Sequence, residues 1–349
     1  MKRNFGVDIA RVMSMFMVVV IHNLNQGGVL KNTTSVIGFL SSYELFNLSI
    51  VAVNVFALIT GYVYSGKGIK LKRVVGLYLE VLFLSVFSLV IYTLFFGLPK
   101  NSDVIKSIFP LLTGVYWYYN AYVGFVLIEP VIRIGVNSLT RNNLLRVLVV
   151  MLLFAGSVGF IDNRFLQGGY SIEWLVILFI AGNVIKKYSV EISHIGNKLL
   201  VAIVVSASLT SLAAEFVFKS HALRFGLYTS PLVIIQSIAV FILFARIKIK
   251  NNFIQKALLF VSPLSFGVYI LDTSIVFYGY ILKDLFKWLT IENSIVTTLI
   301  TVVGSSVAMF FIFILINFMR VKIFEWLKIN YLIDKFTDFL ENKLSMIRI

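Results

Sequence analysis

The sequence predicts an all-α polytopic membrane protein, a bundle of about ten transmembrane helices with both termini in the cytoplasm. Of its 349 residues, 59% are hydrophobic and only 13% are charged, and its mean hydropathy is +0.93. Soluble domains carry roughly 25% charged residues. Apolar runs of about 20 residues, long enough to span a hydrocarbon core, follow one another with short polar gaps. A water-soluble fold is therefore excluded.

The apolar runs divide the chain into ten expected spans and a tail. Residues 1–325 should form one transmembrane domain. Residues 326–349 should form an amphipathic cytoplasmic tail, because apolar residues there recur every three to four positions between charges, as in a helix lying in the membrane interface. The first run is interrupted by Arg11 and no small-residue cleavage site follows it, so we expect a retained helix rather than a signal peptide. The expected spans are 6–27, 44–65, 74–97, 114–134, 144–160, 170–186, 198–217, 227–245, 258–282 and 295–320.

The basic residues mark the topology. The net charge is +15, but the lysines and arginines form no single patch interleaved with exposed aromatics, so we expect no nucleic-acid partner. With a cytoplasmic N-terminus, 22 of the 31 basic residues fall in inner segments or at the inner ends of spans, eight fall in outer segments, and only Arg11 remains inside a span. This asymmetry follows the positive-inside rule and predicts a multi-pass protein of the cytoplasmic membrane.

Few residue types are available for chemistry. The chain has no cysteine, which excludes disulfides, thiolate nucleophiles and zinc–thiolate sites. It has three histidines: His22 lies in the first span, and we expect His194 and His221 in loops. We expect no metal site. Since no segment is left for a soluble catalytic domain, any chemistry must use side chains within helices or short loops.

Arg11 and His22 form the strongest candidate site. They are 11 residues apart, so on a helix they share a face, offset by about 20° and separated by about 16 Å along the axis. Asp8, three residues before Arg11, is close enough to pair with it. One alternative is that Arg11 snorkels to the inner headgroups and His22 is an interfacial polar residue. A charge within the membrane costs at least about 2.5 kcal/mol unless it lines a polar cavity, so the pair favours a functional site.

Motifs along the chain resemble, in order, those of the acyltransferase-3 family of membrane O-acyltransferases, many of which acetylate bacterial surface polysaccharides. The chain departs from the family pattern at Ala57, which replaces a phenylalanine, at Thr60, which replaces a serine, and at Asp272, where many members have a histidine. The segments that carry the resemblance are Arg11 and His22 with ten residues between them, Phe56–Tyr62, the basic turn Lys70–Arg73, Tyr116–Tyr119 leading to Glu129 and Pro130, Glu173–Gly182, and Ser262–Leu271.

The resemblance implies an enzyme that transfers an acetyl or other short acyl group from cytoplasmic acyl-CoA to a hydroxyl of an extracytoplasmic polysaccharide or lipid-linked glycan. Acetyl-CoA would be the cosubstrate. Acyl transfer to a hydroxyl needs a general base, and histidine is suited to this near neutral pH, so we assign that role to His22. Arg11 would hold the pantetheine or phosphate part of the donor, and Asp8 could orient Arg11. Transfer could be direct or pass through an acyl-enzyme.

Further residues are candidates for the donor and acceptor sides. Lys70, Lys72 and Arg73 could bind the phosphates of coenzyme A or simply set the topology. Trp117 and Tyr118 could stack on a sugar or belong to an interfacial aromatic belt. Ionisable residues within spans are functional candidates by default, although Glu129 and Arg133 could instead pair with each other. Those we assign to acceptor binding or support are Glu44, Glu173 and Asp272.

Two other functions fit a bundle of this kind. A transporter or flippase for a polysaccharide or lipid-linked sugar would also have about ten helices with buried charges, but no inverted repeat with paired broken helices is evident. A polysaccharide polymerase would carry a large outer loop, which the sequence lacks. The expected partners are the lipid bilayer, acyl-CoA and a glycan acceptor, and the chain could pair as a homodimer.

Overall fold

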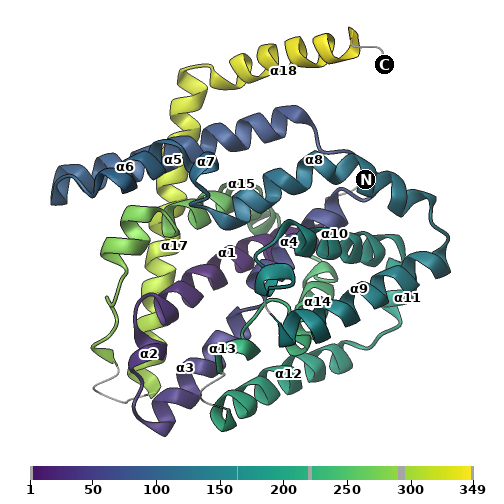
Figure 1. Ribbon diagram of the computed structural model, residues 1–349, viewed down its shortest axis with the longest axis vertical. Helices are drawn as coiled ribbons and strands as arrows, with labels where there is room; N and C mark the ends of the chain where they lie inside the picture. Colours follow the sequence, from purple (N-terminus) through teal and green to yellow (C-terminus); the bar gives the residue numbers. More distant parts are fainter. Residues whose placement is uncertain (1–2, 163, 219–221, 290–294, 347–349) are drawn as a thin grey trace.

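The computed structural model describes residues 3–162, 164–218, 222–289 and 295–346, and every regular element in those ranges is a helix (Figure 1). Eight of the described helices, counting α1 with α2 and α3 with α4 as single spans, are long and apolar enough to cross a membrane. The predicted all-α membrane bundle is thus confirmed. The elements are α1 (Phe5–Asn25), α2 (Val29–Asn32), α3 (Val36–Ser49), α4 (Ala52–Val63), α5 (Leu71–Phe96), α6 (Asn101–Ile108), α7 (Pro110–Thr113), α8 (Trp117–Ser138), α9 (Arg141–Ile161), the 3₁₀ turn η1 (Leu166–Gly169), α10 (Ile172–Lys187), α11 (Ser189–Ser193), α12 (Asn197–Val217), α13 (Ala222–Phe225), α14 (Pro231–Ala245), α15 (Asn252–Asp272), the π-helical turn η3 (Phe277–Ile281), α17 (Ile295–Trp326) and α18 (Ile329–Met346).

The two remaining predicted spans are the short helices α10 and α14. They have 16 and 15 residues, or about 24 and 22 Å, which is less than the hydrocarbon core of about 30 Å. Most side chains of α10 are buried by the surrounding helices.

The structure also shifts two predicted boundaries. The second span begins at α3, where Ser35 accepts a hydrogen bond from the backbone N–H of Gly38, and the ninth ends at Asp272 rather than at residue 282.

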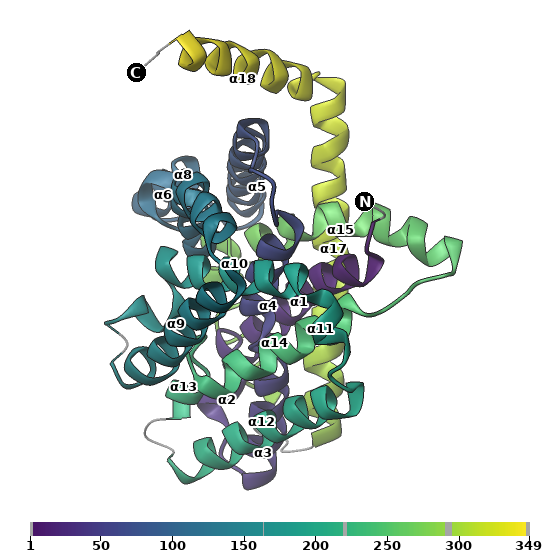
Figure 2. The ribbon, with the colours of Figure 1, turned by 90° about the vertical axis from the view of Figure 1, so that its right-hand side faces the viewer.

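Helix α1 runs through the middle of the bundle, where it contacts α3, α4, α14, α15 and α17 (Figures 1 and 2). Its polar side chains therefore face protein or a cavity rather than lipid. Arg11 of α1 hydrogen-bonds Ser262 of α15, and further along both helices His22 hydrogen-bonds Asp272. The helices α1 and α15 therefore run in the same direction. The first and ninth spans of an alternating bundle must be parallel in this way.

Glycines bring α4 and α10 into close contact beside α1. A Cβ atom on Gly61 of α4 would meet the backbone oxygen of Phe179, and one on Gly182 of α10 would meet the backbone oxygen of Leu58. Small residues that allow close backbone approach are typical of helix packing within membranes. This contact holds α4 against the core, where it forms one wall of the cavities described below.

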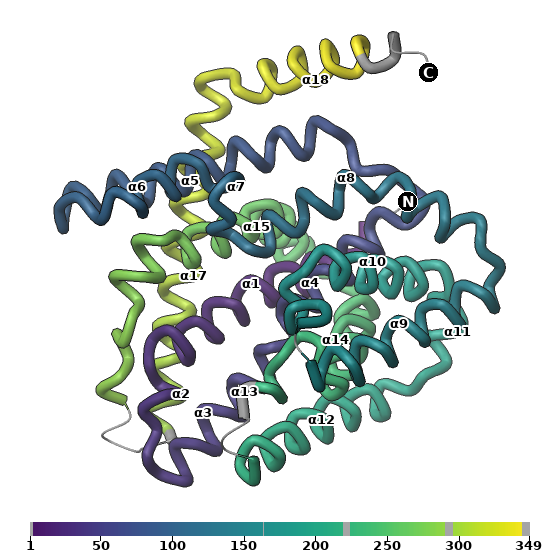
Figure 3. Tube along the Cα trace, in the orientation of Figure 1, coloured from purple at the N-terminus to yellow at the C-terminus, as the bar shows by residue number. Residues whose placement is uncertain are grey.

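Both ends of the described chain lie on one side of the bundle. Arg3, which precedes α1, lines the same cavity as Asn330 and Ile333 of α18. After α17 the chain turns at Lys328, which has a positive φ of 55°, and α18 then extends away from the α17 axis (Figure 3). Asp334 of α18 forms a salt bridge with Lys72 of α5. That this side faces the cytoplasm stays a prediction from the basic residues.

Candidate active site

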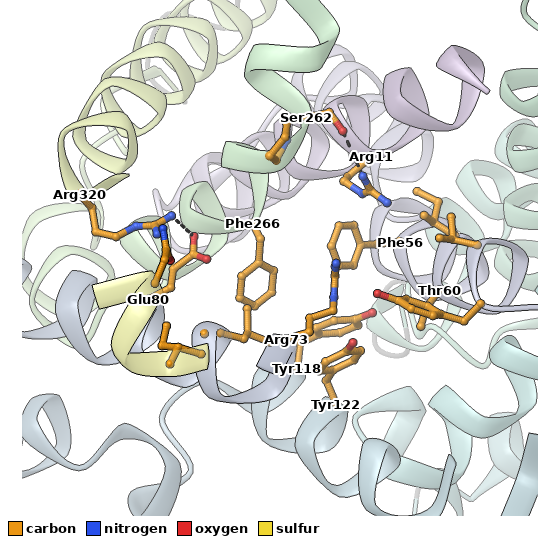
Figure 4. Close-up of a pocket in the computed structure, with 18 of the residues that line it drawn as sticks. Arg11, Phe56, Thr60, Arg73, Glu80, Tyr118, Tyr122, Ser262, Phe266 and Arg320 are labelled. Atoms are coloured by element: carbon orange, nitrogen blue, oxygen red, sulfur yellow. Dashed lines mark hydrogen bonds and ion pairs between the residues drawn. The ribbon is translucent and has the colours of Figure 1, made fainter. Parts of the chain in front are cut away.

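A cavity of about 460 Å³ lies on the side of the chain termini, and we call it the Arg11 cavity. Residues of α1, α4, α5, α8, α15, α17 and α18 line it, and Figure 4 shows several of them around the cavity. Four arginines line it together with a single carboxylate. Its polar lining consists of Arg3, Arg11, Thr60, Tyr64, Arg73, Glu80, Tyr118, Tyr122, Ser262, Arg320 and Asn330, and its aromatic lining also includes Phe56, Phe266 and Phe324.

Arg11 is held at the wall of this cavity by a buried polar cluster. Its Nη1 lies 3.6 Å from Oδ1 of Asp8, which confirms the predicted pairing, and donates a hydrogen bond of 3.2 Å to Oγ of Ser262. Asp8 also accepts hydrogen bonds from Arg3, the shorter at 2.7 Å, and from Ser262. The single negative charge of Asp8 is thus shared by two guanidiniums, so a net positive charge faces the cavity.

Arg73 and Arg320 stand on other walls of the Arg11 cavity. The Arg320 guanidinium is matched by a carboxylate, since its Nη2 lies 3.2 Å from Oε1 of Glu80. Arg73 has no carboxylate within salt-bridge distance in the described part of the chain, and its guanidinium lies over the ring of Tyr64 at 5.6 Å. Two carboxylates, Asp8 and Glu80, therefore face four guanidiniums. Such an excess of fixed positive charge around a water-accessible cavity binds anions, phosphates above all.

A second cavity of about 340 Å³ lies further along α1, and we call it the His22 cavity. Its lining is aromatic with few polar groups, and His22 is its one residue with an imidazole. The rings of Trp117 and Tyr170 lie with centroids 4.4 Å apart, and Tyr228 stacks on Trp117 at 5.8 Å. The lining residues are Ile21, His22, Asn25, Phe46, Ile50, Val115, Trp117, Tyr170, Gly226, Leu227, Tyr228, Tyr269, Thr273 and Tyr278.

His22 is paired with a fully buried carboxylate. Its Nδ1 lies 2.5 Å from Oδ2 of Asp272, which is 0% exposed at the end of α15. A carboxylate accepts the Nδ1–H proton, so it selects the tautomer whose Nε2 carries the free lone pair. The ring of Tyr278 meets the imidazole edge to face, with centroids 5.1 Å apart. The imidazole of His22 is thereby held in one orientation.

Tyrosines around the His22 cavity keep their protons over a wide pH range. Burial, followed by the nearby Asp272 carboxylate, raises the pKa of Tyr278 to about 12. Burial likewise raises the pKa of Tyr170, and it raises the pKa of Tyr228 well above its ordinary range. Their hydroxyl groups therefore stay available as neutral hydrogen-bond donors.

A narrow space of about 20 Å³, which we call the constriction, lies between the two cavities. It shares Phe56 and Tyr118 with the Arg11 cavity, and His22 and Trp117 with the His22 cavity. Val53 lines the constriction and neither of the two larger cavities. The three spaces thus adjoin one another in a row beside α1, which we call the path, with Arg11 and His22 at its two ends.

The comparisons with known proteins agree with the sequence resemblance. A family model described as an acyltransferase domain, that of the acyltransferase-3 family, matches residues 4–318, nearly the whole chain. The chain belongs to the acyltransferase-3 family. Comparisons with curated proteins and with solved structures found no match. The protein is thus a multi-pass membrane acyltransferase. The family match favours this function over the transporter and polymerase alternatives.

Several candidate residues of the acyltransferase converge on this path. Arg11 and Arg73 line the Arg11 cavity, with Asp8 behind Arg11. Tyr118 lines both that cavity and the constriction, and Trp117 lines the constriction and the His22 cavity. Asp272 contacts His22.

The other candidates lie away from the path. Lys70 and Lys72 are exposed and line neither cavity, and Lys72 pairs with Asp334. Glu173 is exposed near the start of α10, and Glu44 lies between α3 and α12. Glu129 and Arg133 pair with each other at 3.0 Å. His194 is exposed, and His221 lies outside the described residues.

Sequence reasoning missed several residues of the acyltransferase site. Ser262 was noted only as part of a motif, yet it bridges Asp8 and Arg11. Tyr170 and Tyr228 were placed at the starts of predicted spans, but they lie in the loops before α10 and α14, and hydropathy does not show that these loops face a cavity. Arg320 lies at the cytoplasmic end predicted for the last span, so it was counted only as a basic residue that sets the topology.

Among the residues that the structure describes, no three His, Cys, Asp or Glu side chains form a metal-binding group.

Proposed function

We propose that this acyltransferase moves an acetyl or other short acyl group from cytoplasmic acyl-CoA to a hydroxyl of an extracytoplasmic polysaccharide or lipid-linked glycan. The observation that carries the proposal is the path along α1. An arginine-lined cavity at one end is joined through a constriction to an aromatic cavity with an oriented histidine at the other. The path thus joins an anion-binding site for a donor to a general base for an acceptor.

The Arg11 cavity suits the donor. Coenzyme A carries several phosphate charges and a long, uncharged pantetheine arm. Arg73, which has room for a new partner, would bind phosphate at the mouth, and Arg11, deeper inside, would hold the arm or its phosphate end. From there the thioester would reach past Phe56 and Tyr118 toward His22. Acetyl-CoA is the cosubstrate that we propose.

The His22–Asp272 pair suits the chemistry. Nε2 of His22 would take the proton from the acceptor hydroxyl while its oxygen attacks the thioester carbonyl. The carbon–sulfur bond then breaks, the new ester forms, and the imidazolium returns the proton to the thiolate. Asp272 would stabilise the imidazolium between these steps, and the neutral tyrosine hydroxyls around His22 could donate to the developing oxyanion. If the acyl group is first passed to an enzyme side chain, the same base serves each step.

The aromatic lining of the His22 cavity suits a sugar acceptor. Rings of Trp117, Tyr170 and Tyr228 offer flat apolar faces with polar edges, which combine stacking on a sugar with hydrogen bonds to its hydroxyls. The acceptor would enter from the side opposite to the chain termini. This is the extracytoplasmic side in the topology that the basic residues predict.

The direct test follows labelled acetyl from acetyl-CoA into glycan. Membrane vesicles that contain the wild type, His22→Ala or His194→Ala are supplied with the labelled donor on the cytoplasmic side. We expect the wild type and His194→Ala, which changes an exposed histidine, to label the glycan equally, and His22→Ala to lose nearly all labelling. Equal labelling by His22→Ala would exclude the catalytic role, and labelling of no native glycan by the wild type would contradict the proposed reaction.

A second test separates the donor role of Arg11 from a structural role. Arg11→Ala should weaken acetyl-CoA binding to the purified protein while the protein still inserts and keeps its unfolding temperature. The matched control is Arg146→Ala, since Arg146 is exposed on α9 and lines neither cavity. If Arg11→Ala lowers stability but binds acetyl-CoA like the wild type, Arg11 is structural.

A further inference from the structure

A second group of buried polar residues lies between α3 and α12, away from the proposed acyl-transfer path. The two helices contact each other and lie side by side in both ribbon views (Figures 1 and 2). Glu44 and Asn47 come from α3, and Ser208, Ser211 and Glu215 come from α12. None of these residues lines the Arg11 cavity, the constriction or the His22 cavity. The proposed reaction leaves this cluster without a role.

Hydrogen bonds within the cluster connect the two helices. Nδ2 of Asn47 donates to Oε2 of Glu215 at 2.8 Å, and Oγ of Ser208 donates to Oε1 of Glu44 at 2.8 Å. Glu44 also lies close enough to Glu215 for an electrostatic interaction. Each carboxylate therefore uses one oxygen to accept a hydrogen bond from the opposite helix.

The remaining oxygens of the cluster have no hydrogen-bond partner. These buried atoms are Oε2 of Glu44, Oδ1 of Asn47, Oγ of Ser211 and Oε1 of Glu215. Glu215 is 0% exposed, and Asn47 and Ser211 are each 1% exposed. Asn47 binds Glu215 through its amide nitrogen, which leaves its amide oxygen without a partner. Buried polar atoms almost always have a partner, so four unpartnered oxygens on two helices in contact indicate a missing ligand.

The charge of the cluster indicates the sign of that ligand. Neither carboxylate forms a salt bridge in the described part of the chain. A buried carboxylate without a cation is strongly destabilising if ionised, and here Glu215 is fully buried and Glu44 is partly buried. Protonation of Glu215 on Oε1 would remove its charge and allow its hydroxyl to donate to one of the three other oxygens, but the remaining two would still lack a partner. A bound cation would satisfy both the charge and the oxygens.

We propose that this cluster binds a calcium ion. Calcium takes six to eight oxygen ligands from carboxylates, amide carbonyls and water in irregular geometry, whereas magnesium requires near-ideal octahedral geometry and usually keeps several waters. A divalent ion neutralises both carboxylates, and a sodium ion would leave one negative charge buried. Oxygens of Glu44, Asn47, Ser211 and Glu215 would supply the protein ligands. Glu44, which is only partly buried, would provide the entry route.

Calcium at this position would act on the wall of the acceptor cavity. Phe46 of α3 and Ile50, which directly follows α3, line the His22 cavity. An ion shared by α3 and α12 would hold α3 in place and so stabilise this wall. The site is thus structural and takes no part in acyl transfer itself.

The test is calcium binding by the purified full-length protein in detergent after treatment with a chelator. Equilibrium dialysis with radioactive Ca²⁺ should detect one saturable site in the wild type, and Ca²⁺ should raise the unfolding temperature more than equal concentrations of Mg²⁺ or Na⁺. Glu215→Gln should abolish binding and the temperature shift. Ser211→Ala, which removes one oxygen and no charge, should weaken binding severalfold. The control Glu341→Gln changes an exposed carboxylate of α18 and should bind like the wild type.

The opposite results would overturn the proposal. If the wild type binds no Ca²⁺ above the level of Glu215→Gln, or if its stability responds to pH but not to Ca²⁺, the carboxyls are protonated rather than metal-bound. If Glu215→Gln fails to fold, Glu44→Gln and Ser211→Ala decide the question, and calcium affinity equal to that of the wild type in both would exclude the site.

Discussion

His22 and Asp272 are 250 positions apart in the sequence, yet Nδ1 of the imidazole lies 2.5 Å from Oδ2 of the carboxylate. The contact forms because α1 and α15 run parallel through the core and meet twice. Arg11 contacts Ser262 at one level, and His22 contacts Asp272 eleven residues further along α1. One helix pair therefore positions both ends of the proposed path, and the distance between the ends is set by rigid helix geometry.

Replacement of Asp272 by asparagine should greatly reduce turnover while donor binding is unchanged. An amide cannot stabilise the imidazolium as a carboxylate does, and it can turn its NH₂ group toward Nδ1, which selects the wrong tautomer. General-base catalysis contributes about 10²- to 10⁴-fold, so we expect kcat to fall within that range. Steady-state acetyl transfer should show the loss in kcat, with KM for acetyl-CoA close to the wild-type value because the Arg11 cavity is untouched.

Asp272→Glu separates orientation of His22 from simple packing. It keeps the charge and should recover part of the activity that Asp272→Asn loses. If the two variants are equally inactive and both have lowered unfolding temperatures, the carboxylate acts in folding. Full activity in Asp272→Asn would contradict its positioning role.

Arg73 and Lys70 form a matched pair for the donor site, since both belong to one basic turn but only Arg73 lines the Arg11 cavity. A hydrogen bond to a charged group contributes roughly 1.5–3 kcal/mol, so Arg73→Ala should raise KM for acetyl-CoA by about tenfold or more. Lys70→Ala should leave KM unchanged. Measurements at low salt give the largest difference, because salt screens exposed charges. Equal effects in the two variants would mean that the turn acts only through its overall charge.

Hydropathy predicts the spans of this protein well because the bilayer imposes a minimum apolar length. It predicts their ends poorly because local hydrogen bonds decide them. Ser35 caps α3 nine residues before the sequence-based start of the second span. Thr273, whose Oγ1 donates to the backbone oxygen of Tyr269, accompanies the end of α15, although the apolar pattern continues beyond it.

The candidate site could be predicted from sequence only where its residues share one helix. Periodicity places Arg11, Asp8 and His22 on one face of α1, and in the structure Arg11 and His22 line one path with Asp8 behind Arg11. It carries no information on contacts between helices, so the Ser262 bridge and the exact partner of His22 required the fold. The basic turn shows the limit of charge counting, because Arg73 faces the cavity and Lys72 instead pairs with α18.

Val53 is the residue with which the link between the two cavities can be tested. It is 8% exposed and lines the constriction of about 20 Å³ but neither of the larger cavities. Val53→Phe should fill this small space, so acetyl transfer should be lost while acetyl-CoA binding to the Arg11 cavity persists. Binding is measured by calorimetry and transfer by the labelling assay. Normal transfer by a well-folded Val53→Phe protein would show that the acyl group takes another route.

The close contact between α4 and α10 makes a prediction about stability rather than chemistry. A Cβ atom at Gly61 would meet the backbone oxygen of Phe179, and backbone cannot move aside as a flexible side chain can. Overpacking of this kind costs about 1–3 kcal/mol, so Gly61→Ala should lower the unfolding temperature by several degrees. Gly135 is the matched control, since it lies within α8 with no atom within 4 Å of an added Cβ. Gly135→Ala should be neutral or slightly stabilising, because alanine favours helix and reduces the freedom of the unfolded chain. Thermal unfolding of the two variants at one scan rate measures the difference, and equal unfolding temperatures would show that α4 and α10 can separate without loss of stability.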